Sequence, residues 1–314
     1  MMIFRPRILI GIMLMMLASM SFSDGDAYAS GGKAKKLSHE HWHFNGIKGT
    51  YDKEAVQRGF QVYSQVCSNC HSVEQLSFRN LGQKGGPFYL NECPAGSGIA
   101  ETVDCSNPND NPYVKKIAAD YKFQVDADPD EYGEIVQRAP KPSDRIPGPY
   151  RNNNQARAAN NGALPPDLSL IAKARHHGPD YIFNLLQGYK EAPDSVTIAE
   201  GQYYNVYYPG DMSLLIKDEF IERNGTEVTY KVDVPYGGAF AMAPPLSDEI
   251  VDYADETIPE TTEQYARDVT EFLMWAAEPK LEVRKKLGLM SVIYLLILSG
   301  LVYWSSREIW SRAH

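Results

Sequence analysis

The sequence predicts a mainly α-helical domain with long irregular segments, followed by one transmembrane helix near the C-terminus. Apolar residues recur at helical spacing in segments 52–66 and 261–278, which lie near the two ends of the domain. Segment 287–304 carries no charged side chain, and its 18 residues would form a helix about 27 Å long, enough for a bilayer core. The 20 prolines favour long loops over a simple helix bundle.

The N-terminus has the features of a secretory signal peptide. Arg5 and Arg7 form a basic region, residues 8–18 are apolar, and residues 27–29 (Ala-Tyr-Ala) form a cleavage motif with small residues at its ends. An uncleaved membrane anchor is the alternative. The uncharged stretch 8–23 is, however, shorter than the roughly 20 residues that a span needs.

The chain therefore divides into three predicted parts. Residues 1–29 form the signal peptide, residues 30–282 the exported domain, and residues 283–314 the transmembrane anchor with a short cytoplasmic tail. Tyr303 and Trp304 lie at the far end of the apolar stretch, where aromatic side chains favour the membrane interface. Basic residues flank both sides of the stretch, so the orientation follows from the signal peptide. A buried core helix is disfavoured by the uniformly apolar composition.

The charge balance limits the classes of partner. The chain has 40 acidic and 31 basic side chains, a formal net charge of −9. An acidic protein is not expected to bind nucleic acid, and its charge favours a basic partner or none. Residues 126–134 and 248–263 are acidic segments that could dock such a partner, and a simply solvated acidic face is the alternative for each.

Cys67-Ser-Asn-Cys70-His71 is the most informative motif, because Cys-x-x-Cys-His is typical of c-type haem attachment. The two thiols can form thioether bonds to the haem, and the imidazole of His71 can ligate its iron. A zinc site is the alternative. It needs two further ligands, and Cys93 and Cys105 are not spaced like a second Cys-x-x-Cys pair. The motif therefore predicts one covalently bound haem c.

Two predicted helices bracket the domain. The helix at 52–66 runs directly into the haem motif, and Gly59 on its apolar face would allow another helix to approach closely. The helix at 261–278 is followed by Pro279, and a third helix is predicted at 179–188. The small c-type cytochrome fold packs its first and last helices together, and we expect the same here.

The segments between these helices are irregular in pattern. Residues 91–110 are rich in Gly, Pro, Asn and Ser and contain Cys93 and Cys105, and residues 140–149 form a proline-rich loop. An oxidising compartment favours a disulfide between these two cysteines, with two free thiols as the alternative. Asn224-Gly225 predicts a short hairpin.

His39, His41 and His43 alternate with other residues as a metal cluster could, but no fourth ligand lies nearby in the sequence. We expect instead a packed Trp42 with exposed histidines around it.

An electron-carrying haem needs a second axial ligand, and methionine opposite histidine raises the reduction potential. Six of the ten methionines lie in the signal peptide and Met290 lies in the apolar stretch. Met274 is predicted to lie off the apolar face of its helix. Met242 is favoured because its small neighbours admit the haem and the following prolines stiffen the loop. Met212, a histidine or an open position remain alternatives, and an ordinary core methionine is possible for each candidate.

Five segments together resemble the cytochrome c1 family, the membrane-anchored haem subunits of cytochrome bc1 complexes. They are spread over nearly the whole mature chain, in the family's order: 59–71, 158–169, 174–183, 240–246 and 272–279. This combination is far more specific than Cys-x-x-Cys-His alone. The segment 89–150 departs from the family pattern.

The resemblance implies a c-type cytochrome fold with long loop insertions, plus the C-terminal transmembrane helix. It also implies that Met242 is the distal ligand. By the same resemblance, Arg175 and Tyr181 contact the haem propionates, and Asn160 and Pro166 line the haem crevice. Without it, Arg175 would be interpreted as a surface cation and Tyr181 as a core aromatic.

The resemblance further implies one-electron transfer in a respiratory chain. The donor would be the Rieske iron–sulfur protein, which works beside cytochrome b, and the acceptor a soluble, basic cytochrome c. The family also implies a dimeric complex. The short, plain signal peptide favours a bacterial source, and so a location in the inner membrane with the haem domain on the periplasmic side. The sequence shows no nucleophile motif or phosphate-binding loop that would favour a different activity over electron transfer. A haem-based sensor or small peroxidase with an open distal site is one alternative, and a structural or assembly subunit is another.

Overall fold

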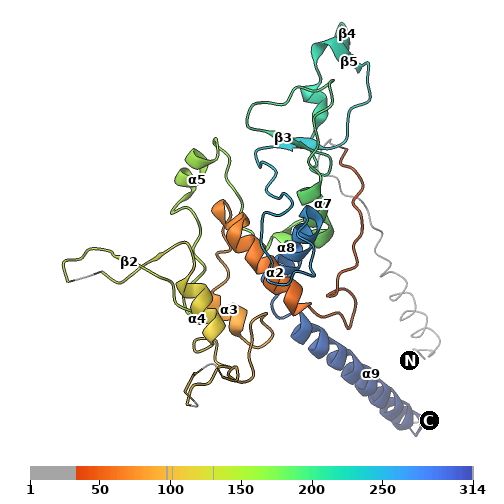
Figure 1. Cartoon of the computed structure of the whole chain (residues 1–314). Helices are drawn as coiled ribbons and strands as arrows, with labels where there is room; N and C mark the ends of the chain where they lie inside the picture. Colours follow the sequence, from red (N-terminus) through yellow and green to blue (C-terminus); the bar gives the residue numbers. More distant parts are fainter. Residues whose placement is uncertain (1–32, 97, 101, 130, 313–314) are drawn as a thin grey trace.

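Helices α2 (Lys53–Gln65) and α8 (Thr262–Ala277) pack against each other at the centre of the domain (Figure 1). The computed structural model describes residues 33–96, 98–100, 102–129 and 131–312, so the predicted signal peptide and its cleavage site lie outside the described residues. The Asp52 carboxylate caps α2 and the Thr261 hydroxyl caps α8. The predicted pairing of first and last helices is therefore confirmed.

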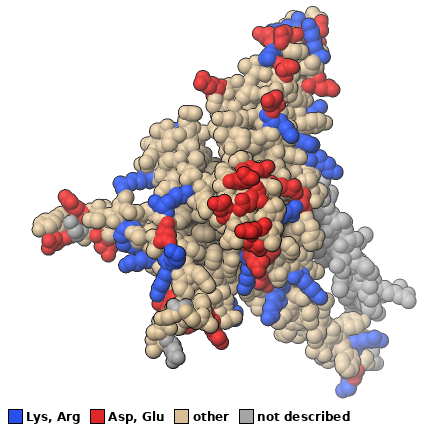
Figure 2. All heavy atoms as spheres, in the orientation of Figure 1, with Lys and Arg blue, Asp and Glu red and all other residues tan. Residues whose placement is uncertain are grey.

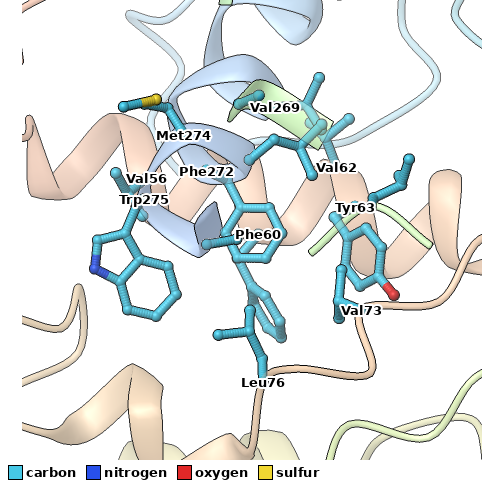
Figure 3. Packing of buried hydrophobic residues seen from close by; sticks show 14 of the residues in the cluster. Val56, Phe60, Val62, Tyr63, Val73, Leu76, Val269, Phe272, Met274 and Trp275 are labelled. Atoms are coloured by element: carbon cyan, nitrogen blue, oxygen red, sulfur yellow. The ribbon is translucent and has the colours of Figure 1, made fainter. Parts of the chain in front are cut away.

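Gly59 is the point of closest approach between these helices. A Cβ atom there would lie 1.9 Å from the Asp268 carbonyl oxygen and 2.8 Å from the Phe272 Cβ. Phe272 in turn contacts the rings of Phe60 and Tyr63, with centroids 5.5 and 5.4 Å apart (Figure 3). The absence of a side chain at Gly59 thus lets the aromatic core form.

Helix α8 is buried around most of its circumference, because α6 (Ile171–Ala174) and α7 (Gly178–Gln187) also pack on it. Met274 is consequently only 8% exposed and belongs to the main core. The expectation that Met274 lies off the apolar face was wrong, since α8 has more than one buried face. Helix α7 matches the predicted helix at 179–188.

The segment after the haem motif contains more structure than its composition suggested. Its elements are η1 (Cys67–Asn69), α3 (Phe78–Gly82), α4 (Pro112–Ala119), β1 (Val125–Asp126), β2 (Gln137–Arg138) and α5 (Asn153–Ala159). Strands β1 and β2 pair antiparallel in an arm that projects from the body (Figure 1). A disulfide joins Cys93 to Cys105, as the oxidising compartment led us to expect.

A second, smaller apolar cluster lies apart from the main core and consists of Val196, Tyr204, Met212 and Ile216. The elements near it are β3 (Tyr203–Asn205), η2 (Met212–Leu215), η3 (Asp218–Phe220), β4 (Ile221–Asn224), β5 (Glu227–Tyr230) and β6 (Gly238–Phe240). Strand β3 pairs antiparallel with β6, and β4 with β5. The β4–β5 pair turns at Gly225, whose φ of 67° suits glycine, which confirms the predicted hairpin.

Helix α9 (Leu281–Ser311) extends away from the domain (Figure 1). It is long and apolar enough to cross a membrane, and its most apolar window is not buried within the described structure. The helix begins at Leu281, so the predicted domain boundary at residue 282 falls in its first turn.

Candidate haem site

The Cys-x-x-Cys-His motif forms a tight turn at the end of α2. The backbone N–H groups of Cys70 and His71 both donate to the Cys67 carbonyl oxygen, at 3.1 and 2.9 Å. Neither cysteine of the motif takes part in a disulfide; Cys67 is half-buried and Cys70 is exposed. Burial raises the pKa of the Cys67 thiol to about 12. The turn therefore brings two thiols and one imidazole together over five residues.

The imidazole of His71 is held in the orientation that iron ligation needs. Its Nδ1 lies 2.8 Å from the Pro166 carbonyl oxygen. A carbonyl can only accept, so Nδ1 carries the proton and the lone pair of Nε2 is free for a metal. Burial lowers the pKa of His71, which favours the neutral form that binds iron. This donor arrangement fits a c-type haem.

The loop that carries Pro166 is fixed by Asp167, a residue that the sequence analysis missed. Its carboxylate accepts hydrogen bonds from the Ser72 hydroxyl at 2.9 Å and from the Glu74 backbone N–H at 2.7 Å. It also accepts from the Ser169 N–H, and this Asp-x-Ser turn is the signal that could have found it. Asp167 thus ties the loop to the chain just after His71.

Asn160 ends helix α5 and has a clear structural role there. Its side-chain amide donates to the Tyr150 hydroxyl at 2.9 Å and to the Ala156 carbonyl oxygen at 2.7 Å. Asn160 therefore connects the end of α5 to the segment around Tyr150.

Met242 follows strand β6 and is half-buried. Its backbone carbonyl accepts a hydrogen bond from the Tyr189 hydroxyl at 3.2 Å. The ring of Phe240 stacks on Tyr189 and on Tyr208, with centroids 5.8 and 4.6 Å apart. Phe240 begins the segment 240–246 that resembles the family, but neither tyrosine stood out in the sequence, since their contacts join distant segments.

The other two candidate methionines are enclosed by protein. Met212 is 1% exposed in the second apolar cluster, and Met274 lies in the main core. Of the three, Met242 is the one with a partly open side chain, which supports its choice as the distal ligand.

Arg175 and Tyr181 are brought together near the same aromatic group. Burial raises the pKa of Tyr181 to about 12, and the positive charge of Arg175 opposes that shift. Tyr208 and Tyr189 also interact electrostatically with the Tyr181 phenol. Arg175 and Tyr181 therefore lie close enough to interact, while His71 and Pro166 are joined by their own hydrogen bond.

The histidine cluster near residue 40 is organised around Trp42, as expected. Trp42 is 3% exposed, and its indole N–H donates to an Asp180 carboxylate oxygen at 2.7 Å. His39, His41 and His43 are exposed.

The mainly helical fold and the attachment turn with its oriented imidazole define a c-type cytochrome. Residues 42–313 match the family model described as the Cytochrome C1 family, and the chain belongs to that family. Haem is accordingly its cofactor and electron transport its role, and α9 suits a membrane anchor.

Named relatives agree with this assignment. "Cytochrome c1, heme protein, mitochondrial" of Saccharomyces cerevisiae is 41% identical over 86% of this chain and 71% of its own length. "Cytochrome c1" of Blastochloris viridis is 37% identical over 90% of this chain and 89% of its own. The chain is also 37% identical to "Cytochrome b/c1" of Bradyrhizobium diazoefficiens, of which it spans 37% of the length.

Proposed function

We propose that the chain binds one haem c covalently through Cys67 and Cys70, with His71 and Met242 as axial ligands. The observation that carries this proposal is the hydrogen bond from His71 Nδ1 to the Pro166 carbonyl, which leaves Nε2 free. When bound, the haem supplies a one-electron redox couple between its ferric and ferrous forms.

The protein's own residues orient and tune this group. Pro166 fixes the tautomer of His71, and Tyr189 holds the backbone of Met242. The Arg175 guanidinium offsets the negative charge of the haem propionates, and the Tyr181 phenol donates to them. Asn160 helps to form the wall of the crevice by fixing the end of α5.

The electron donor in this proposal is a Rieske iron–sulfur protein, and the acceptor is a soluble, basic cytochrome c. The chain would act as the haem subunit of a dimeric cytochrome bc1 complex that also contains cytochrome b. A similar protein of Candida albicans, 40% identical, is named "Cytochrome b-c1 complex catalytic subunit, mitochondrial", which supports this assignment. The complex would function as the quinol:cytochrome c oxidoreductase of a respiratory chain.

A basic acceptor finds a complementary surface in segment 248–263. Figure 2 shows acidic side chains gathered at the centre of the face over α2 and α8. The acidic residues of this segment, which we call the acidic patch, are Asp248, Glu249, Asp252, Asp255, Glu256, Glu260 and Glu263. Such a patch attracts a cationic partner and makes the association rate dependent on salt. The acidic residues on the β1–β2 arm are fewer and lie apart from it.

The docking proposal is tested with matched charge variants. One variant carries Glu249→Gln, Asp252→Asn and Glu256→Gln in the acidic patch. The control carries Asp126→Asn, Asp128→Asn and Glu131→Gln on the β1–β2 arm. Electron transfer from the reduced chain to a basic cytochrome c is followed by stopped flow at increasing salt. The patch variant should be slower than the control by roughly tenfold at low salt, and the two should converge at high salt. Equal rates, or no salt dependence, would contradict docking at the acidic patch.

The haem domain is proposed to lie on the periplasmic side of a bacterial inner membrane. The bacterial relatives support this location, as does α9, the one helix of the described residues that is long and apolar enough to cross a membrane. A protease added outside intact spheroplasts should digest the haem domain. Digestion only after lysis would contradict the orientation.

A further inference from the structure

A cavity of about 400 Å³ lies where α9 leaves the haem domain, between this helix, α6 and the loop at residues 44–46. Four cationic side chains and one carboxylate line it: Lys173, Arg175, Arg284, Lys285 and Glu278. Figure 2 shows Lys and Arg side chains around the base of α9. The cavity therefore has a surplus of three positive charges.

The single carboxylate cannot neutralise these cations. Glu278 accepts hydrogen bonds from both Lys173 and Arg284, so it is shared between two of them. The Lys285 ammonium donates instead to the backbone carbonyl oxygens of Phe44 and Gly49, which carry no net charge. An ammonium has three N–H donors, so Lys285 retains one for a further acceptor. Arg175 is the candidate partner of the haem propionates, so the charge left for a ligand in the cavity is centred on Lys285, on which the carboxylate of Glu282 also acts.

The position of the cavity along α9 indicates what can reach it. Lys285 precedes the apolar stretch 287–304 by two residues, a rise of about 3 Å along the helix. The headgroup layer on each side of a bilayer core is roughly 5–7 Å thick. With α9 across the membrane, the cavity lies at the level of the lipid phosphates. The neighbouring loop presents Ile47, 72% exposed, at the same end of the domain.

We propose that this cavity binds the headgroup phosphate of an anionic phospholipid from the leaflet next to the haem domain. The phosphate would accept hydrogen bonds from Lys285 and Lys173, and the acyl chains would lie along the apolar part of α9. Bound lipid would then fix the angle between the haem domain and its anchor. The inference rests on the membrane anchor and does not depend on the haem ligands.

The test uses the full-length, haem-loaded chain in mild detergent and counts retained lipid by native mass spectrometry. The probes are phosphatidylglycerol and phosphatidylcholine with the same acyl chains. Phosphatidylglycerol should be retained in preference. Lys285→Gln and Lys173→Gln should each weaken its retention roughly fivefold, as expected for about 1 kcal/mol per cation near an anionic lipid. Lys286→Gln is the matched control, because Lys286 is exposed in the same layer but does not line the cavity.

Arg175 stays unchanged in this test, because its guanidinium is also the candidate partner of the haem propionates. If Lys285→Gln impairs folding through loss of its carbonyl contacts, Lys173→Gln decides the question, since Arg284 still pairs with Glu278.

Equal retention of the two lipids would overturn the proposal. So would an equal loss in Lys286→Gln, which would indicate charge along the helix rather than a site. Displacement of the lipid by millimolar inorganic phosphate would assign the cavity to a free anion. Cross-linking of Lys285 to an acidic residue of another subunit in the native complex would assign it to a protein partner.

Discussion

The Tyr189 hydroxyl donates a hydrogen bond to the backbone carbonyl oxygen of Met242, with 3.2 Å between the two oxygens. Tyr189 follows the end of α7, and Phe240, two residues before Met242, stacks on its ring. The loop that carries the candidate distal ligand is therefore attached to the segment directly after α7, the helix that contains Tyr181. The placement of Met242 depends on a residue 53 positions away in the sequence.

Replacing Tyr189 by Phe should loosen Met242 while keeping the aromatic stack. Loss of the hydrogen bond costs about 1 kcal/mol, so the fraction of ferrous haem with an open distal position should rise roughly fivefold. The larger open fraction should be seen as increased carbon monoxide binding. The midpoint potential of the haem should fall at the same time. Tyr203→Phe is the control, since Tyr203 is 40% exposed on β3. Unchanged carbon monoxide binding in Tyr189→Phe would show that the hydrogen bond does not position the ligand.

Covalent attachment predicts a graded response to loss of the two thiols. Haem staining after denaturing electrophoresis should persist in the Cys67→Ala and Cys70→Ala variants, each with one thioether, and vanish in the double variant. A variant with Cys93→Ser and Cys105→Ser should keep its haem, because those residues form the disulfide elsewhere. Haem that migrates with the Cys67/Cys70 double variant would argue against attachment at this motif.

Gly59→Ala should destabilise the haem domain strongly. The added methyl group would overlap the Asp268 carbonyl oxygen, which cannot move without shifting α8. Overpacking of this kind typically costs 1–3 kcal/mol or more, so we expect a loss of about 3 kcal/mol in a denaturant titration. Gly288→Ala is the matched control in a helix interior, since a Cβ there meets nothing within 4 Å. Equal stability of the two variants would mean that the helices do not approach so closely.

Glu271 should make stability depend on pH. Burial, followed by the negative charges of Asp52 and Asp268, raises the pKa of this carboxyl from 4.5 to about 7. Its Oε2 has no hydrogen-bond partner within the described part of the chain, and Oε1 lies 3.6 Å from His43 Nδ1. Arg267 offsets the negative charges only in part.

Proton uptake by Glu271 determines whether stability rises or falls with pH. Between pH 4.5 and 7 the folded chain keeps a proton on Glu271 that the unfolded chain has lost, so stability falls as the pH rises. Glu271→Gln should remove this fall and gain about 3 kcal/mol relative to the native chain at pH 8. Glu256→Gln, an exposed acid, should leave the profile unchanged. If the free energy of unfolding depends on pH in the same way for the native chain and for Glu271→Gln, the raised pKa is refuted.

The sequence predicted the long elements because their physical signals are strong. Helices α2 and α8 extend over 13 and 16 residues with clear apolar periodicity and side-chain caps, and α9 is marked by its uncharged stretch. The haem motif is local, so it too could be recognised without knowledge of the fold.

The short elements could not be predicted in the same way. Helices α4, α5 and α6 have eight, seven and four residues, too few to display a period. The burial of Met274 was predicted wrongly, because an apolar pattern along one face of a helix cannot show that three other helices cover α8. The hydrogen bond from His71 to Pro166 joins residues 95 positions apart. The family resemblance indicated Pro166, but only the fold showed that its carbonyl oxygen is the functional group.

Ligation of the haem by His71 and Met242 is tested most directly by reduced-minus-oxidised spectra with and without carbon monoxide, recorded for the native chain and for Met242→Leu. We predict a sharp low-spin c-type band that carbon monoxide leaves unchanged in the native chain and alters in Met242→Leu. Met212→Leu should behave like the native chain, since Met212 lies in the second apolar cluster. Carbon monoxide binding by the native chain would contradict the account, because it would mean an open distal position and favour a sensor or peroxidase.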